Sequence, residues 1–574
     1  MITALLVVAV FLSVVFLLAW PLGKYIYYVV EDPESLKPLR SFLSLEKKLF
    51  SRVGNLYFQN MTWREYFFSL LAFHTLGIVL LFLLLRFQGL LSFFDRTAHN
   101  MPAFTAFNTA ISFVTNTDWQ SSIPEKDVSW IIGAVGLGPQ LFFSAAVGIC
   151  LLCCLSRAFV YKETKTIGSF WKDLVRISIC VLFPLALLFS PLLVATGVPQ
   201  SFKGITTYSS YENPSNTSDI LLGCTATHVA IRQLGTNGGG LYAANAAHPF
   251  ENPSPWSNIL EIGLMLLIPI ALCRTFGEIV RMRRQAILLL SVMGVLFLFA
   301  CAAAFWAEGA DIPFLAPTQL FHATGNMEGK ECRFGPFWSI FWSVSTTATS
   351  TGSVNSSLSS YLPLGGGVPL ALMQLGEVIF GGVGTGAAGA IVFLLVAVFA
   401  AGLMVGRTPE YLGKKIETRE MKFVTLLTIL PAALVLITTA IVLTTPIGIS
   451  SLSAHSSHGV TEALYAFSSA AANNGSSFAG LDANIPFYNV LLGIVMYISR
   501  LFSAAMILAL AGSLAGKKQV AIGAGTLPTD TVAFGLWFAF VILIIGALNF
   551  LPAFVLGPGI EHMTLCEMWN NAFG

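Results

Sequence analysis

Four short clusters of small polar residues, far apart along the chain, have the residue types and spacing of an ion-binding site. They are Thr115-Asn116-Thr117-Asp118, Gly235-Thr236-Asn237-Gly238-Gly239-Gly240, Ser350-Thr351-Gly352-Ser353 and Asn473-Asn474-Gly475-Ser476. Glycine accepts a positive φ, which lets a loop turn successive carbonyls to one side. Four such loops around one axis could replace the hydration shell of a monovalent cation with backbone oxygens. One Asn-Gly or Gly-Gly pair would indicate only a turn, so this interpretation depends on the repetition.

Each cluster follows an apolar stretch that is too short to cross a membrane. The four stretches lie near residues 103–114, 221–234, 336–348 and 460–472. We expect each to be a re-entrant helix whose partly negative C-terminal end points at a common cavity. A unit of span, re-entrant helix, polar loop and span therefore occurs four times, which indicates an internal repeat.

Composition identifies the environment of these elements. The chain has 574 residues, of which 55% are apolar and 10% charged, and its mean hydropathy is +0.75. So few charges exclude a soluble enzyme, a disordered protein and a nucleic-acid binder. Ten apolar runs are long enough to span a bilayer. They are 2–30, 65–88, 129–155, 174–197, 257–276, 286–307, 369–405, 422–446, 486–514 and 531–555. The first has no basic segment before it and is predicted to be a transmembrane helix, not a cleaved signal.

The distribution of basic residues predicts the orientation. Most of the 31 lysines and arginines lie in alternate loops, at 21–64, 156–176, 274–284, 407–422 and 517–518. Because basic loops stay in the cytoplasm, both chain termini are predicted to be extracytoplasmic. The chain then divides into an N-terminal helix with its loop, four pore repeats, the third with a broken second helix, and a C-terminal helix. Their ranges are 1–61, 62–156, 170–284, 285–416, 417–518 and 519–574.

Two charged residues, Glu377 and Arg500, fall inside predicted spans. Ionisable groups at this depth indicate function, although a structural interhelix pair would also explain them. In the functional interpretation they line the ion path below the loops, where Arg500 would repel a second cation. The 369–405 run is longer than a span requires and contains Gly381, Gly382 and Gly384. It is predicted to be a broken helix whose flexible middle lies under the four loops; simple small-residue packing is the alternative. The interruption resembles the loop that acts as a gate in transporters of the potassium-channel superfamily, which implies the same role here.

Enzymatic motifs are absent from the sequence. It has no GxxxxGK[ST] phosphate loop, no Asp-Lys-Thr-Gly and no HExxH, and its nine cysteines suggest no disulfide framework. The GxGxxG match at 384–389 lies in an apolar span and does not predict nucleotide binding. The chain alone is therefore not expected to hydrolyse ATP. Arg232, which precedes the second cluster, is expected to contact carbonyls or a nearby acid.

Several longer motifs resemble one family. They are 110–120 around the first cluster, 234–240 with Asn245-Ala-Ala-His-Pro-Phe-Glu-Asn-Pro253, Gln374–Gly384, Gly402–Lys415 and Asn473–Leu481. Together they resemble the potassium-binding and translocating subunit (KdpA type) of the bacterial Kdp P-type potassium-transporting ATPase. The resemblance extends over most of residues 55–520.

The resemblance implies an all-α fold with ten transmembrane helices and four potassium-channel-like repeats. It implies that the filter carbonyls come from three residues of each loop, with Gln120 just behind the first loop. These residues are Asn116, Thr117, Asp118, Thr236, Asn237, Gly238, Ser350, Thr351, Gly352, Asn473, Asn474 and Gly475. Two positions differ from the family pattern, since Asp118 replaces asparagine and Thr351 replaces cysteine. A carboxylate at the outer mouth is expected to raise the local cation concentration.

The resemblance also implies three kinds of partner: a P-type ATPase catalytic subunit, a single-span accessory subunit, plus a very small fourth peptide in some members. Potassium is the expected ion, because carbonyl loops without a ring of acids suit a weakly hydrated monovalent cation. No organic cofactor is expected, and the expected location is the bacterial inner membrane. Two alternatives are an autonomous potassium channel or symporter of the same superfamily and, more remotely, a membrane-embedded enzyme.

Overall fold

The computed structural model describes residues 2–37, 39–50, 57–91, 99–209, 217–309, 325–520 and 527–573. Within these residues, ten helices are long and apolar enough to cross a membrane. They are α1 (Ile2–Glu31), α3 (Trp63–Arg86), α6 to α7 (Trp130–Val160), α8 to α9 (Phe170–Ala195), α11 (Pro255–Ile279), α12 (Arg283–Glu308), α15 (Thr385–Val405), α16 (Thr418–Thr444), α19 (Pro486–Ala515) and α20 to α21 (Val532–Glu567). The all-α polytopic fold with ten candidate spans is therefore confirmed.

Four shorter helices precede the polar clusters. They are α4 (Ala103–Val114), α10 (Thr225–Leu234), α13 (Gly335–Ala348) and α18 (Ser457–Ala472). Three of them begin within a few residues of the predicted start. The second was predicted to begin at 221, which is wrong, because Thr217–Leu221 forms strand β4 and pairs with β3 (Ile205–Ser209). Gly223 then adopts a positive φ of 41° between the strand and the helix.

The remaining elements are short. The helical ones are η1 (Pro33–Ser35), α2 (Leu39–Phe50), η2 (Gln88–Leu91), α5 (Pro124–Asp127), η5 (Asn245–Ala247), η7 (Leu358–Ser360), α14 (Pro363–Gln374) and α17 (Pro446–Ser450). The strands are β1 (Met61–Thr62), β2 (Thr166–Gly168), β5 (Glu410–Tyr411) and β6 (Lys414–Lys415), and β1 pairs with β2 and β5 with β6. α14 and α15 are the two halves of the predicted broken helix, separated by 375–384.

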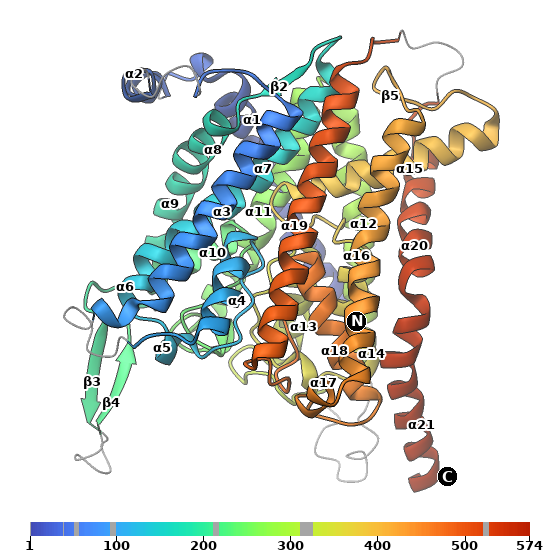
Figure 1. Cartoon of the computed structure of the whole chain (residues 1–574). Helices are drawn as coiled ribbons and strands as arrows, with labels where there is room; N and C mark the ends of the chain where they lie inside the picture. Colours follow the sequence, from blue (N-terminus) through green and yellow to red (C-terminus); the bar gives the residue numbers. More distant parts are fainter. Residues whose placement is uncertain are drawn as a thin grey trace.

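The elements of the basic loops share one end of the molecule. Figure 1 shows α2, β2 and β5 at the top, whereas the β3–β4 hairpin and the C-terminus lie at the bottom. This arrangement is the one that the distribution of lysine and arginine predicts. The assignment of the top end to the cytoplasm stays a prediction.

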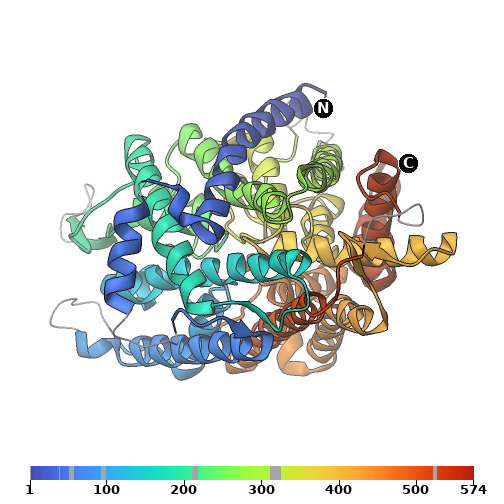
Figure 2. The same cartoon turned by 90° about the horizontal axis from the view of Figure 1, so that it is seen from above.

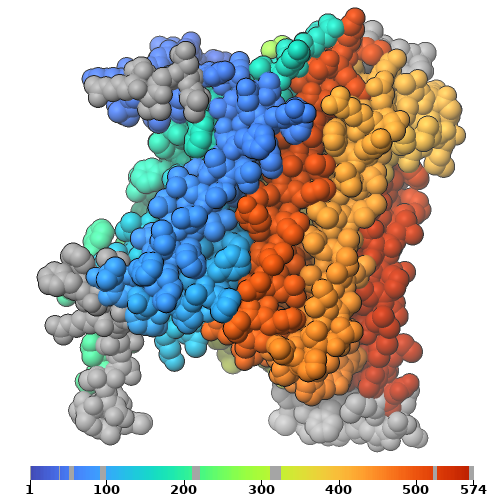
Figure 3. Space-filling model, viewed as in Figure 1, coloured from blue at the N-terminus to red at the C-terminus, as the bar shows by residue number. Residues whose placement is uncertain are grey.

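Apolar side chains cover much of the outer surface. On the face in Figure 3, α3, α19 and α16 lie side by side, and α20 lies beyond them. On α20, Leu536 is 68% exposed and Leu548 is 77% exposed. Leucines this exposed indicate a lipid-facing surface, because water would disfavour so large an apolar area.

Close helix packing supports the interior. α1 packs along α11, and a side chain at Gly23 would overlap the Ala271 carbonyl oxygen. Thr275 donates its hydroxyl hydrogen to the Gly23 carbonyl at 2.9 Å. Viewed from above in Figure 2, most of the N-terminal half of the chain lies to the left and most of the C-terminal half to the right, although the N-terminus itself lies near the top and right of the middle. The repeats of the two halves therefore face each other across the middle of the protein.

Buried ion pairs join the helices at the end that carries the basic loops. Arg157 of α7 donates through Nε to Glu31 of α1 at 2.6 Å. It donates through both terminal nitrogens to Asp173 of α8, at 2.6 and 2.9 Å. Arg176 contacts Glu46 of α2 in a similar pair at 2.9 Å. These charges are part of the fold, because a buried charge is tolerated only with a partner.

We expect Arg157→Ala to destabilise the protein strongly. The substitution leaves the buried carboxylate of Asp173 and the partly buried one of Glu31 without their arginine, which costs about 3–5 kcal/mol. The measurement is the thermal unfolding temperature of the protein in detergent. Arg284→Ala is the matched control, because Arg284 is 83% exposed in its pair with Asp530 and a surface pair contributes little. Equal unfolding temperatures for the two variants would contradict the prediction.

Candidate functional site

The four polar loops share one backbone conformation. In each loop the first and third of the three residues predicted as filter residues have a positive φ and the middle one does not. The first residues are Asn116 (62°), Thr236 (48°), Ser350 (52°) and Asn473 (57°). The third residues are Asp118 (51°), Gly238 (88°), Gly352 (79°) and Gly475 (97°). This conformation costs energy in a residue with a side chain, most of all in the β-branched Thr236, so its fourfold recurrence indicates a functional constraint.

The same hydrogen bond ends each re-entrant helix. The middle loop residue donates its backbone N–H to the carbonyl five residues earlier. The pairs are Thr117 to Ser112 at 3.0 Å, Asn237 to Arg232 at 2.8 Å, Thr351 to Thr346 at 2.8 Å and Asn474 to Ser469 at 2.9 Å. A left-handed residue followed by this bond is the Schellman ending of a helix. The motif reverses the chain, so each loop turns back directly from the helix end.

Glycines bring each loop against the next. A side chain on Gly238 would overlap the carbonyl oxygen of Thr351, and one on Gly352 would overlap that of Asn474. A side chain on Gly475 would likewise overlap the Thr117 carbonyl oxygen. The second loop therefore contacts the third, the third the fourth and the fourth the first, which places the loops around one axis.

Side chains reinforce the ring. Asn116 donates its amide to the Thr236 carbonyl at 2.9 Å, which joins the first and second loops. Ser350 donates its hydroxyl hydrogen to the Asn473 carbonyl at 3.2 Å. The Asn473 amide in turn donates to the Thr117 hydroxyl oxygen at 2.8 Å. Some loop carbonyls are thus fixed by neighbours, and the ring closes through hydrogen bonds as well as through glycine contacts.

The two positions that differ from the family pattern are both accommodated. Thr351 shares a hydrogen bond with the Thr349 hydroxyl at 2.7 Å, as Thr117 does with Thr115 at 2.9 Å. Asp118 is only 4% exposed, and neither of its carboxylate oxygens has a hydrogen-bond partner among the described residues. Its carboxylate does not reach solvent at the mouth, where we expected it, because the left-handed backbone turns the side chain against Gly239 of the second loop.

Gln120 joins the first loop to the second. Its side-chain amide donates to the Gly240 carbonyl at 2.8 Å, and its oxygen accepts the Gly240 N–H at 3.0 Å. Beyond Gly240, His248 stacks on the ring of Tyr242, with 3.9 Å between ring centroids. Burial there lowers the pKa of His248, so the imidazole is neutral and accepts the backbone N–H of Phe250 at 3.1 Å.

The break between α14 and α15 lies against the second and third loops. Gly381 donates its N–H to the Ala348 carbonyl at 2.8 Å, and Val383 donates to the Thr236 hydroxyl at 3.0 Å. Gly384 has a φ of 82°, and a side chain there would overlap the Gly148 carbonyl of α7. The glycines of the broken helix thus allow close packing beside the loops; the gate remains a proposal.

A cavity of about 170 Å³ lies beside this break and is lined by both Glu377 and Arg500. Glu377 accepts the Asn474 amide at 2.9 Å, and Arg500 donates to the Ser144 carbonyl at 3.2 Å. Among the described residues no ion pair joins Glu377 to Arg500. The structure therefore supports two separate ionisable groups on one cavity and not the interhelix pair that we considered.

Sequence reasoning did not identify all residues that hold the loops. Arg232 contacts an acid, as expected, but the acid is Glu251, and Glu261 lies close as well. Asn245 and Ser353 link the second and third loops at 2.8 Å. The motif from Asn245 to Pro253 was a signal of their importance, although nothing in it indicated the partner Ser353.

These features define a class: a polytopic membrane protein of four pore-like repeats whose loops meet on one axis above a charged cavity. Within that class, the chain belongs to the family described as potassium-transporting ATPase A subunit (KdpA), which it matches over residues 9–563. The family resemblance noted in the sequence is thereby confirmed.

Relatives of the chain carry the name "Potassium-transporting ATPase potassium-binding subunit". The protein from Sorangium cellulosum is 46% identical over 97% of this chain and 98% of its own length. Those from Herpetosiphon aurantiacus and Erwinia tasmaniensis are 45% and 44% identical, over 97% and 98% of this chain and 98% and 99% of their own lengths. Among solved structures, the potassium transporter TrkH from Vibrio parahaemolyticus aligns with a TM-score of 0.46 and 13% identity, over 74% of this chain and 83% of that one.

We expect Gly352→Ala to abolish the stabilisation of the protein by potassium, because the new methyl group collides with the Asn474 carbonyl oxygen. The measurement is the rise in unfolding temperature on titration with K⁺. Gly406→Ala is the matched control: Gly406 has a similar φ of 71° but no atom within 4 Å of the added carbon. The free energy of unfolding of the control falls by about 1–2 kcal/mol from backbone strain alone. The control keeps its response to K⁺. Loss of that response in both variants, or in neither, would contradict the prediction.

Proposed function

We propose that this chain selects and translocates potassium for an ATP-driven, high-affinity uptake complex. It binds K⁺ at the extracytoplasmic filter formed by the four loops and passes the ion to a P-type ATPase subunit. The observation that carries this proposal is the alternating sign of φ, repeated in all four loops. Alternation turns neighbouring carbonyls to one side of a strand, and carbonyls so arranged replace the hydration shell of a cation.

The chemistry of the loops supports a monovalent ion. Of the twelve proposed filter residues only Asp118 carries a charge, and the others offer neutral oxygens. A divalent ion such as Ca²⁺ is bound by several carboxylates, which this ring lacks. Potassium, which is weakly hydrated, fits a ring of neutral oxygens, and the names of the relatives support the same ion.

The cavity on the proposed cytoplasmic side of the loops supports a lateral exit for the ion. Its lining includes Asn473 of the fourth loop, Leu427 and Pro431 of α16, and Ile545 and Asn549 of α20. An ion that passes the filter would reach Glu377 and Arg500 and then leave between α16 and α20. Arg500 would repel a second cation there, which keeps the pathway from conducting freely.

The remaining parts of the pump come from partners. In our proposal these are a P-type ATPase catalytic subunit, a single-span accessory subunit, plus a small fourth peptide in some complexes. The complex lies in the bacterial inner membrane, with both termini of this chain on the extracytoplasmic side. An autonomous potassium channel or symporter is the alternative function, and it predicts ion flux without ATP hydrolysis.

We expect a complex purified through a tag on this chain, from its native host, to hydrolyse ATP. The rate rises as K⁺ is added from the micromolar range upward, and vanadate inhibits it, because a P-type subunit is coupled to ion binding in the loops. The measurement is phosphate release with and without vanadate. Absence of any ATPase, together with potassium flux through the chain alone in liposomes, would establish the alternative function instead.

We expect Arg500→Ala to loosen coupling between ATP hydrolysis and potassium transport, because the cavity loses its fixed positive charge. Fewer ions are then transported per ATP hydrolysed, as measured by ⁸⁶Rb⁺ uptake and phosphate release in the same vesicles. Arg500→Lys keeps the charge and is expected to restore most of the coupling. Unchanged uptake and hydrolysis in Arg500→Ala would refute this role.

A further inference from the structure

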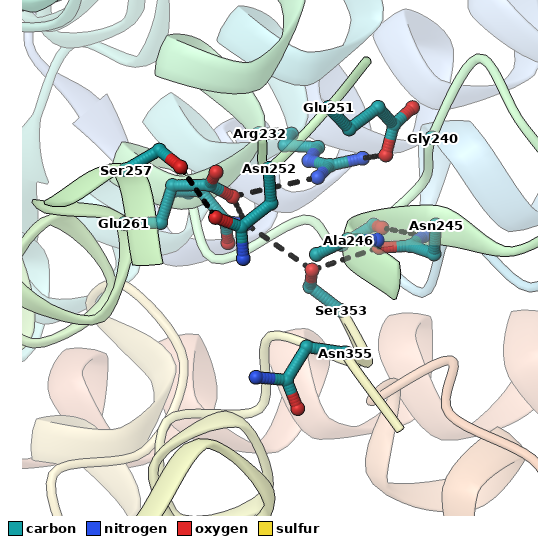
Figure 4. Close-up of polar contacts among 12 residues, drawn as sticks. Arg232, Gly240, Asn245, Ala246, Glu251, Asn252, Ser257, Glu261, Ser353 and Asn355 are labelled. Carbon is teal, nitrogen blue, oxygen red and sulfur yellow. Dashed lines mark hydrogen bonds and ion pairs between the residues drawn. The ribbon is translucent and has the colours of Figure 1, made fainter. Parts of the chain in front are cut away.

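Three charged side chains lie fully buried behind the second loop. Arg232, Glu251 and Glu261 are each 0% exposed, and Figure 4 shows Arg232 between the two acids. Arg232 donates through Nη1 to Glu251, and its Nη2 lies 3.6 Å from a carboxylate oxygen of Glu261. Glu251 also accepts the backbone N–H of Leu241 at 2.8 Å. Charges so deeply buried keep one arrangement, because separating them would leave each without a partner.

A chain of hydrogen bonds leads from this cluster to the second loop. Gln233 donates its side-chain amide to Glu261 at 2.8 Å and to the Ser353 hydroxyl oxygen at 3.1 Å. Ser353, from the third loop, donates to the Asn245 side-chain oxygen at 2.8 Å (Figure 4). Asn245 then donates its amide to the carbonyl oxygen of Gly238 at 2.6 Å. We call these four residues, Glu261, Gln233, Ser353 and Asn245, the relay.

The hydrogen bonds of the relay run in one direction. Gln233 turns its NH₂ group towards Glu261, because the amide nitrogen lies 2.8 Å from a carboxyl oxygen of Glu261 and 3.1 Å from the Ser353 hydroxyl oxygen. That NH₂ group also donates to Ser353, so the Ser353 hydroxyl hydrogen is left for the Asn245 oxygen. Asn245, which also accepts the Ala246 N–H at 2.9 Å, must then present its NH₂ group to Gly238. The relay therefore fixes which side of the Asn245 amide faces the loop.

The Gly238 peptide needs such a constraint. Glycine populates both signs of φ readily, so the peptide after Gly238 could rotate if its carbonyl had no partner. Among the described residues, no side chain is seen to donate to the carbonyls of the equivalent Gly352 and Gly475. The second loop therefore depends on its relay in a way that the third and fourth loops do not.

We propose that Asn245, oriented by Ser353 and Gln233, is a positioning residue that sets the Gly238 carbonyl and thereby the discrimination between potassium and other monovalent cations. The proposal rests on the proposed function, in which the loops bind the ion. Ser353 belongs to the third loop, so the relay also fixes the spacing between the second and third loops. A change in that spacing is expected to alter the ion radius that the loops prefer. Its effect on the turnover of the pump is expected to be smaller.

The test is Ser353→Ala in the intact complex purified through this chain. The variant removes one hydroxyl, while Gln233 keeps its bond to Glu261 and Asn245 keeps its bond to Ala246. The apparent KM and kcat of ATP hydrolysis are measured with K⁺ and with Rb⁺. The ratio of the two KM values is expected to change about 3- to 10-fold, the range for loss of one hydrogen bond, with kcat nearly unchanged. Ser353→Thr keeps the hydroxyl and restores the ratio.

Two further variants make the result decisive. Asn245→Asp is isosteric but cannot donate as a carboxylate, so it changes the ratio in the same way even if Ser353→Ala fails to assemble. Ser356→Ala is the matched control, because Ser356 is also buried and its hydroxyl bonds, among the residues that the structure describes, to Asn355 and Tyr361 and not to the relay. An unchanged KM ratio, a uniform fall in kcat with both ions, or failure of both relay variants to assemble while the control does would overturn the proposal.

Gly238→Asp separates this proposal from the proposed function. If Gly238→Asp changes ion affinity or selectivity while the relay variants do not, the relay is rejected and the filter stands. If Gly238→Asp also retains the parent potassium affinity and rubidium discrimination, the filter assignment itself is rejected, and the relay with it.

Discussion

The close approach of each loop to its neighbour is the constraint on which the rest of the structure depends. At Gly238, Gly352 and Gly475 the backbone of one loop lies so near the carbonyl oxygen of the next that no side chain fits between them. This spacing is possible only if every loop turns back sharply from its helix, which explains the four identical helix endings. It also requires the C-terminal ends of the four helices to meet near the centre of the protein.

A ring of this kind must be held from outside, because loops without regular structure cannot hold themselves at membrane depth. The structure meets this need in three places, two with polar side chains and one with backbone N–H groups. Gln120 and the relay brace the outer side of the second loop, and the break between α14 and α15 supports the second and third loops from below. The cavity lined by Glu377 and Arg500 is then the open space that remains beneath the ring.

Local signals in the sequence were enough to predict most of the fold. The ten spans followed from long apolar runs, the re-entrant helices from runs too short to span, and the break in the third repeat from its glycines. The relay could not be predicted, because more than a hundred residues separate Gln233 from Ser353 in the sequence. None of Gln233, Asn245 and Ser353 carries a sequence signal of its own. The start of α10 was wrong for a different reason: Leu221 lies in strand β4, which pairs with β3, and a pairing of this kind is not visible in a local apolar pattern.

The ring is not fully symmetric, and the asymmetry follows from one residue. Three of the four third positions are glycines that contact the next loop directly, whereas the first loop has Asp118 there. A side chain at this position excludes the close contact, so the first and second loops are joined by Asn116 and Gln120 instead. The second loop thus receives side-chain bonds on both of its sides, from the first loop and, through Ser353, from the third. The fourth loop is also bonded to both of its neighbours, through Ser350 and Asn473. Among the described residues, however, only the second loop is seen to have a side-chain donor on the carbonyl of its third filter residue, which makes it the part of the ring best suited to set ion selectivity.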